Sequence, residues 1–307
     1  MSPKKKVLLL GGLLMDRFLL TESYPGRGED TLVREEYCRA GGCPLNAARV
    51  LAALGAEPVL YSALGEDGMA RELAETVDRF GLSREALYLL PGGKTGYCLI
   101  VLDREGERTF FTYRGCEGHF DRARLSPALV EELAAVFVTG IYLVYPGWSE
   151  GAVAFLEELS ARGIPILFDP GSLIGEMDPG LLRRTAEAAV LLTPNGWERR
   201  ELERILSVPD LPAWAADRGA ACLETRGAEG AVLTTREGTR VIPPYPARVV
   251  DTTGAGDSFA GGLLAALLGG QSLEEAARTA GVCGALAAEV TGVPDCLTWE
   301  AVRARMG

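Results

Sequence analysis

Residues 251–259 read Asp-Thr-Thr-Gly-Ala-Gly-Asp-Ser-Phe. The stretch follows strand-like residues at 240–242 and 249–250, and it opens an apolar helix predicted over 259–268. Small residues at such a helix N-terminus let backbone N–H groups approach a phosphate, and the helix dipole adds roughly half a positive charge. The sequence therefore predicts an anion site at three consecutive amides, those of Gly254, Ala255 and Gly256.

Asp257 is the charged member of this loop. A carboxylate in the first turn of a helix is most simply explained as a helix cap. Beside an anion site, however, the same carboxylate can accept a proton from a hydroxyl that attacks a phosphoryl group. The loop by itself leaves both interpretations open.

The composition limits the class of function. A length of 307 residues, 48% of them apolar and 24% charged, suits one globular α/β domain. A net charge of −11 argues against a nucleic-acid or anionic-membrane partner, because those partners recruit basic surfaces. The seven cysteines form no CxxC pair, which is typical of the reducing cytoplasm. We expect a cytoplasmic protein that acts on small molecules.

Three features that could indicate other chemistry do not do so. Gly92-Gly93-Lys94-Thr95 lacks the first glycine of a P-loop and leads into a strand, and Gly11-Gly12 does not continue as GxGxxG. His119 is the only histidine, which excludes HExxH zinc chemistry, and we expect it to be a surface loop residue. Acid–base chemistry must therefore be done by carboxylates.

Strand-like and helix-like segments alternate along most of the chain. Strands are expected at 7–11, 58–64, 135–139, 165–168, 189–192 and 220–224, and helices at 45–54, 69–80, 151–161 and 198–206. This order predicts an α/β fold with a doubly wound, mainly parallel sheet flanked by helices on both faces. Ligands of such sheets bind outside the carboxyl ends of the strands.

Two regions break the alternation. Residues 31–38 and 96–113 read as strands without a helix between them, and the second forms a hairpin that turns at 103–106. Extra antiparallel strands inserted into an α/β domain commonly lie outside its sheet. We expect one domain over residues 1–307 with a small β-sheet lid from residues near 12–40 and 93–114.

Polar residues follow several of the predicted strands. Gly41 and Gly42 precede a helix and would allow close approach of a ligand, and Asn46 offers a donor and an acceptor to a polyol. Turn glycines with a helix-side asparagine are an equally simple explanation. Asp16 follows the first strand, at the edge where ligands collect.

Two further strand ends carry similar signals. Asn195 and Glu198 lie three apart across a helix start, so one can cap the helix while the other reaches a hydrated metal ion, although capping alone explains both. Thr225, Gly227 and Gly230 form another glycine-containing loop, which is also explained as a hairpin turn.

The order of these motifs resembles that of the ribokinase/PfkB family of carbohydrate kinases. The pattern comprises Gly41-Gly42-x-x-x-Asn46, Asn195-x-x-Glu198, Thr225-x-Gly227-x-x-Gly230 and the loop at 251–257. The likeness runs from Val7 to about Trp299. It implies a β-meander lid on a doubly wound core, with ATP and the sugar meeting beneath the lid.

The resemblance also implies roles for the reacting groups. Asp257 would be the catalytic base, and the amides of Gly254 to Gly256 would form the anion hole. The acceptor hydroxyls would be held by Asp16, Gly41, Gly42 and Asn46.

On the nucleotide side, the resemblance implies that Asn195 and Glu198 serve the phosphates and Mg²⁺ through water. The nucleotide pocket would be lined by Thr225, Gly227 and Gly230. In potassium-activated members the positions of Asp251 and Thr253 ligate a monovalent cation, so K⁺ is an open candidate here.

Two departures bear on the acceptor. Cys43 stands where ribokinases proper have a cationic lysine, which puts ribose in doubt. Tyr113-Arg114 is similar to the aromatic-plus-arginine pattern of 2-keto-3-deoxygluconate kinases, in which Arg114 would pair with a substrate carboxylate; a surface arginine is the alternative.

The sequence thus predicts an ATP-dependent kinase for a hydroxyl of a small sugar or sugar-like substrate. A nucleoside kinase of the same family is the alternative acceptor assignment, and a non-catalytic sugar-binding regulator is the alternative class. Retention of Asp257 and its glycine loop argues against the regulator. Unpaired lid edges predict a homodimer formed through the lid.

Overall fold

The apolar run after the basic N-terminal residues forms an interior strand of the main sheet. In the computed structural model, which describes residues 5–145, 147–291, 294 and 297–306, this run is strand β1 (Lys6–Leu10). Val7 and Leu9 pack into one hydrophobic cluster and Leu8 and Leu10 into another. Because successive strand side chains point to opposite faces, β1 is buried on both sides.

The large sheet has nine strands in the order β13-β12-β11-β10-β9-β8-β1-β4-β5. The neighbours of β1 are parallel to it, as are all pairs from β5 to β11, whereas β11, β12 and β13 pair antiparallel. Besides β1, its strands are β4 (Glu57–Leu64), β5 (Leu87–Leu89), β8 (Leu133–Thr139), β9 (Ile166–Asp169), β10 (Leu191–Leu192), β11 (Ala221–Thr225), β12 (Ala231–Thr235) and β13 (Gly238–Ile242). The predicted mainly parallel sheet is confirmed.

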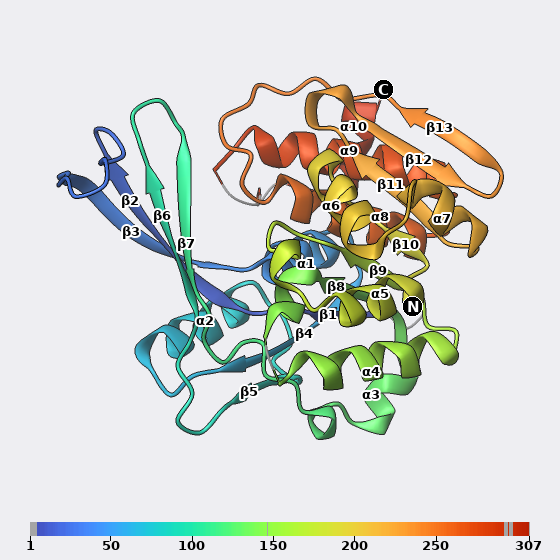
Figure 1. Cartoon of the computed structure of the whole chain (residues 1–307), viewed down its shortest axis with the longest axis horizontal. Coiled ribbons are helices and arrows are strands. Elements are labelled where there is room, and N and C mark those ends of the chain that lie inside the picture. The colour runs from blue at the N-terminus through green and yellow to red at the C-terminus, as the bar shows by residue number, and fades with distance from the viewer. Residues whose placement is uncertain (1–4, 146, 292–293, 295–296, 307) are drawn as a thin grey trace.

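Helices cover both faces of this sheet (Figure 1). The cluster that contains Val7 also holds side chains of α1 (Cys43–Ala53), α2 (Gly68–Arg79), α8 (Ala255–Leu268), α9 (Leu273–Ala288) and α10 (Trp299–Met306). The cluster that contains Leu8 holds side chains of α3 (Pro127–Glu131), α4 (Ser149–Ala161), α5 (Pro179–Ala188), α6 (Gly196–Leu206) and α7 (Leu211–Asp217). Short 3₁₀ turns are η1 (Arg122–Arg124), η2 (Gly140–Val144), η3 (Ile174–Glu176) and η4 (Gly227–Glu229).

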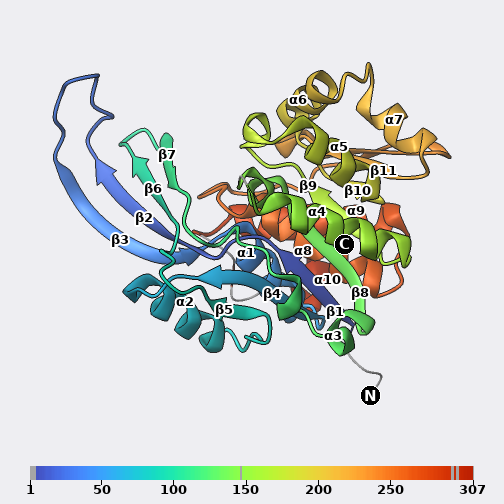
Figure 2. The ribbon, with the colours of Figure 1, turned by 60° about the horizontal axis from the view of Figure 1, so that its bottom comes forward.

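A second, four-stranded sheet projects from the body as a lid (Figure 2). Its order is β3-β2-β6-β7, with β2 (Leu14–Thr21), β3 (Val33–Gly41), β6 (Tyr97–Leu102) and β7 (Arg108–Tyr113). The predicted small lid sheet is confirmed, but its central pair β2 and β6 is parallel, so the lid is not the β-meander that the resemblance implies. A crossover through α1, β4, α2 and β5 separates these two strands in the chain and returns it in the same direction.

The segment before the 251–259 loop differs from the expectation. Val249 and Val250 belong to no strand and are exposed, so the predicted strand there is wrong. The helix after the loop begins at Ala255, four residues earlier than predicted. Of the described helices, none is long and apolar enough to cross a bilayer.

Candidate active site

Two helix N-termini meet at the carboxyl edge of the sheet, and they bring Asn46 to Asp257. Asn46 Nδ2 donates a 2.8 Å hydrogen bond to Asp257 Oδ2 across 211 positions of sequence. The helices α1 and α8 pack closely because Gly261 of α8 has no side chain; a Cβ there would lie 2.7 Å from Ala47 O. The carboxylate of Asp257 is therefore held by a neighbouring helix.

Asp257 does not cap its own helix. The N-cap of α8 is Gly254, in the left-handed conformation at φ 77°, and no side chain bonds to the first turn there. A left-handed residue at this position favours glycine. Gly256 is exposed and a Cβ there would contact nothing within 4 Å, so the helix end is open, while Ala255 N–H already donates to Thr252 O at 3.2 Å.

Asp16 lies beside the same group, but in a lid strand and not in a loop after β1. It is the third residue of β2, and its carboxylate lies against Gly41, where a Cβ would be 2.0 Å from Asp16 Oδ2. Gly42 has φ 104° and would place a Cβ 2.3 Å from Gly12 O. Gly41 is therefore required for the chain to pass this close to Asp16, and Gly42 is required by its positive φ and by the backbone of Gly12.

Burial shifts the protonation of these carboxyls. It raises the pKa of Asp16 to about 7, with a further contribution from the charge of Asp257. Burial also raises the pKa of Asp257, and hydrogen bonds from Asn46 and from the Cys43 thiol oppose that rise. Burial likewise raises the pKa of Cys43, so its thiol acts as a donor and not as a thiolate.

The shift of Asp16 predicts a pH-dependent stability. Between its ordinary pKa of 3.8 and about 7, the folded protein binds the proton more tightly, so the free energy of unfolding falls as pH rises. Asp16→Asn removes this effect and should raise the melting temperature more at about pH 8 than at about pH 5. Asp217→Asn, at the exposed end of α7, is the control. An equal increase in melting temperature at both pH values would contradict the raised pKa of Asp16.

Asp169, which was not predicted, belongs to the site. It ends β9, and its Oδ2 lies 3.5 Å from Thr193 Oγ1. Burial raises its pKa well above the ordinary value, and the charges of Glu198 and Asp257 raise it further. The signal was present in the sequence, because an aspartate at the end of a buried parallel strand lies at the ligand edge.

Asn195 and Glu198 form a capping box at the start of α6. Asn195 Oδ1 accepts from the N–H groups of Trp197 and Glu198 at 2.9 Å each, and Glu198 Oε2 accepts from Asn195 N–H at 2.8 Å. Burial raises the pKa of Glu198. The structure therefore shows the capping contacts, and it also places the Glu198 carboxyl beside Asp169.

The loop of Thr225, Gly227 and Gly230 is the hairpin turn between β11 and β12. Both glycines have positive φ, and a Cβ at Gly230 would lie 2.2 Å from Ile242 O. Thr225 bridges to Asn195, and Thr225 N–H donates to Pro194 O at 2.9 Å. The two predicted nucleotide motifs are therefore neighbours.

Arg114 and the pair Asp251 and Thr253 have other partners. Arg114 Nη1 donates to Val144 O at 3.0 Å, and Nη2 lies 3.6 Å from Glu176 Oε2. Its guanidinium thus spans the turns that follow β8 and β9. Asp251 and Thr253 are brought together by the lid residue Arg108.

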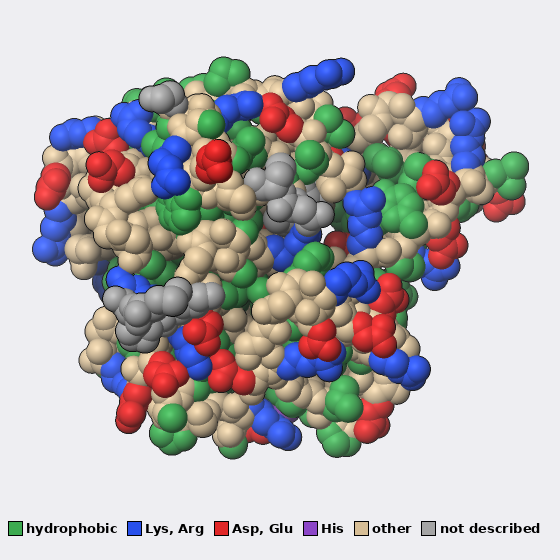
Figure 3. Space-filling view, turned by 180° about the vertical axis from the view of Figure 1, so that it is seen from behind, with side chains coloured by type: hydrophobic (Ala, Val, Ile, Leu, Met, Phe, Trp, Pro, Cys, Tyr) green, Lys and Arg blue, Asp and Glu red, His purple; other side chains and the backbone are tan. Residues whose placement is uncertain are grey.

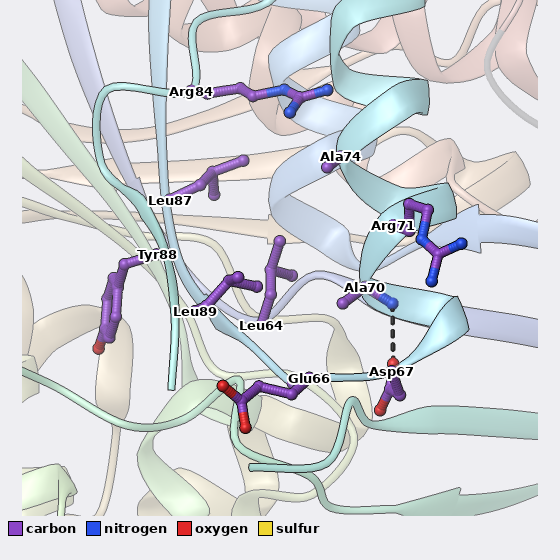
Figure 4. Close-up of a pocket in the computed structure, with 11 residues that line it drawn as sticks. Leu64, Glu66, Asp67, Ala70, Arg71, Ala74, Arg84, Leu87, Tyr88 and Leu89 are labelled. Carbon is purple, nitrogen blue, oxygen red and sulfur yellow. Dashed lines mark hydrogen bonds between the residues drawn. The ribbon is translucent and has the colours of Figure 1, made fainter. Parts of the chain in front are cut away.

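A cavity of about 530 Å³ lies elsewhere, between α2 and the edge strand β5. In Figure 4, Asp67 accepts a hydrogen bond from Ala70 N–H and caps α2 beside the cavity. The cavity is lined by Leu64, Gly65, Glu66, Asp67, Ala70, Arg71, Ala74, Arg84, Leu87, Tyr88 and Leu89. None of the residues that surround Asp257 lines it.

Comparison with known proteins matches residues 4–300 to the family model described as pfkB family carbohydrate kinase. The uncharacterized sugar kinase YegV of Escherichia coli K12 is 30% identical over 90% of this chain and 86% of its own length. The nucleoside kinase of Burkholderia thailandensis in complex with inosine superposes with a TM-score of 0.83 at 29% identity, covering 97% of this chain and 96% of that one. An Arabidopsis thaliana ribokinase complexed with ribose and ATP shares the fold, with a TM-score of 0.81 at 22% identity over 100% and 99% of the two chains.

Proposed function

The chain belongs to the pfkB family of carbohydrate kinases, and from this we propose that it transfers the γ-phosphoryl group of ATP to a hydroxyl of a small sugar or sugar-like acceptor. The observation that carries the proposal is the Asn46–Asp257 contact where two helix N-termini meet. It supports a positioned carboxylate next to unpaired helix amides, which is the arrangement that hydroxyl phosphorylation needs.

In the proposed reaction the acceptor hydroxyl loses its proton to Asp257 as its oxygen attacks the γ-phosphorus in line. The bond from phosphorus to the bridging oxygen breaks, and ADP leaves with its electron pair. Asn46 donates to Oδ2 of Asp257 and holds the carboxylate in place for this proton transfer. Burial raises the pKa of Asp257, so it is a stronger proton acceptor than an exposed aspartate.

The backbone amides of Gly254, Ala255 and Gly256 are the proposed anion hole. The positive end of α8 lies on the same side as these amides. The bond from Ala255 N–H to Thr252 O leaves Gly254 and Gly256 as the amides with the most freedom to bind phosphate oxygens.

The residues at the edge of β9 and α6 fit a hydrated Mg²⁺. Burial raises the pKa of both Asp169 and Glu198, and the charge of Glu198 raises the pKa of Asp169 further, so a nearby cation would stabilise the two carboxylates. Oxygen donors of this kind suit a magnesium ion that keeps its waters. Bound Mg²⁺ would neutralise charge on the phosphates of ATP. Asn195 and Glu198 would hold it through water, and the hairpin of Thr225, Gly227 and Gly230 would line the nucleotide pocket.

The acceptor is proposed to lie between the lid and α1. Asp16, Gly41, Gly42 and Asn46 surround that position, and Arg114 would reach an acceptor that carries a carboxylate by leaving Glu176. The likeness to the nucleoside kinase complexed with inosine supports a nucleoside as the second candidate acceptor. A non-catalytic regulator would need neither Asp257 nor the open helix end.

The deciding experiment is ATP consumption measured with ketoses, pentoses, keto-deoxy acids and nucleosides, each with K⁺ and with Na⁺. Acceptor-dependent ADP formation identifies the substrate class, and a large ATPase rate without acceptor would contradict a lid that excludes water. ATP binding without turnover on any of the four acceptor classes would favour the regulator.

We also propose a homodimer formed through the lid. Hydrophobic side chains gather on the lid in Figure 3, and Phe110, Phe111 and Tyr113 of the edge strand β7 are each more than 40% exposed. Phe111→Glu should convert a dimeric mass in light scattering to a monomeric one, because it charges the proposed interface. Val241→Glu, on β13 of the large sheet, should not. A monomeric mass for the unmodified protein would refute the dimer.

The proposed location is the cytoplasm, where ATP is supplied. The six cysteines in the described part of the chain are all free thiols, which supports a reducing compartment.

A further inference from the structure

The lid contacts the loop at 251–254 through Arg108, the first residue of β7. Arg108 Nη2 lies 2.7 Å from Asp251 Oδ1, and Nη1 donates to Thr253 Oγ1 at 2.6 Å. The side chain of Arg108 is 20% exposed and that of Asp251 is 7% exposed. The pair is thus shielded from water, unlike the exposed ion pairs that contribute little.

The other contacts of Asp251 fix it in place. Its Oδ1 also accepts from Thr253 N–H at 2.7 Å. The N–H groups of Val250 and Asp251 both donate to Ala288 O at the end of α9. The guanidinium therefore binds a rigid carboxylate three residues before Gly254, where α8 and its free amides begin.

The residues at the positions that ligate K⁺ in potassium-activated relatives already contact Arg108. The side-chain oxygen of Thr253 accepts a hydrogen bond from Arg108, and Oδ1 of Asp251 forms an ion pair with the same guanidinium. A potassium ion at the same oxygens would meet a positive guanidinium. Among the residues that the structure describes, Arg108 is the cation paired with Asp251, and its guanidinium against both side-chain oxygens does not fit a K⁺ ion at the same place.

We propose that Arg108 is a positioning residue that takes the place of the monovalent cation and makes this kinase independent of K⁺. An uncompensated buried carboxylate next to the anion hole would repel the phosphate that the hole must bind. The guanidinium neutralises Asp251 and holds the Asp251–Thr253 turn, so the amides of α8 keep their direction. Because Arg108 belongs to the lid, the neutralising charge reaches the site only when the lid lies over it.

This inference rests on the proposed kinase function, so its test includes an arm that needs no acceptor. The thermal unfolding of the unmodified protein, Arg108→Met, Arg108→Lys and Arg104→Met is measured in KCl, NaCl and choline chloride at equal ionic strength. Arg104 is the matched control because it lies in the same hairpin and pairs with Glu22 inside the lid.

The melting temperature of the unmodified protein should not differ between the three salts, and neither should that of Arg104→Met. Arg108→Met should melt lower in choline chloride and regain stability in KCl, and Arg108→Lys should be intermediate because it keeps the charge but loses the two-pronged contact. A melting temperature of the unmodified protein that rises specifically with K⁺ would overturn the inference. The melting temperature of the unmodified protein in the three salts can be measured even if Arg108→Met does not fold.

The catalytic arm uses the acceptor found by the ATP-consumption experiment. In choline chloride, kcat of Arg108→Met should be at least about tenfold below that of the unmodified enzyme, and KCl should restore it. The kcat of the unmodified enzyme should be the same in both salts. A loss that no cation restores would make Arg108 a structural contact and overturn the inference. Absence of turnover by the unmodified protein would instead count against the proposed function, and the unfolding experiment would still decide the role of Arg108.

Discussion

Asp257→Asn should lower kcat by at least about 10² while leaving the Kd for ATP nearly unchanged. Asparagine has the shape of aspartate and can still accept the hydrogen bond from Asn46, so the two helix ends should keep their geometry. What the variant loses is the ability to take a proton from the acceptor hydroxyl. The experiment pairs steady-state kinetics with calorimetric ATP binding.

The neighbouring residue gives the control for this variant. Ser258 is fully buried, and its hydroxyl has no hydrogen-bond partner in the described structure. Ser258→Ala should therefore leave kcat unchanged and should not lower the free energy of unfolding appreciably. Undiminished turnover in Asp257→Asn would refute its assignment as the base.

Gly254→Ala should lower kcat by about 10², the effect expected when an anion-hole donor is lost or misdirected. An alanine at the φ of 77° observed for Gly254 costs about 1–2 kcal/mol, which the loop can avoid by turning its amides away from the site. The measurement is kcat at saturating ATP, alongside the free energy of unfolding from denaturant titration.

The matched control lies just beyond the other end of the same helix. Gly270 follows α8 with φ 88°, and a Cβ there would contact nothing within 4 Å. Gly270→Ala should cost a similar free energy of unfolding and leave kcat unchanged. If both variants lost activity in proportion to stability, Gly254 would have a structural role only.

The central part of the fold could be predicted from the sequence because its signals are local. β1 is a continuous apolar run after the basic N-terminal residues, and such runs are typical of strands buried on both faces. The start of α8 could not be placed, because Ala255 and Gly256 are followed by an aspartate and carry no apolar periodicity. Packing of α8 against α1 and α9 decides where that helix begins.

The site was predictable as a set of motifs but not as a set of contacts. Asp16 could be selected, yet the sequence did not reveal that it lies inside a lid strand against Gly41. Arg108 could not be found, because nothing near it in the chain indicates a partner more than 140 positions away. Asp169 could have been found by applying the strand-end rule to β9.

The parallel pairing of β2 with β6 has a consequence for how the lid assembles. Its two hairpins are separate pieces of chain, joined edge to edge, and the segment from α1 to β5 lies between them in the sequence. The lid therefore depends on non-local contacts and cannot be excised or transplanted as one continuous segment. In native-state hydrogen exchange, the amides shared by β2 and β6 should open together as a single cooperative unit.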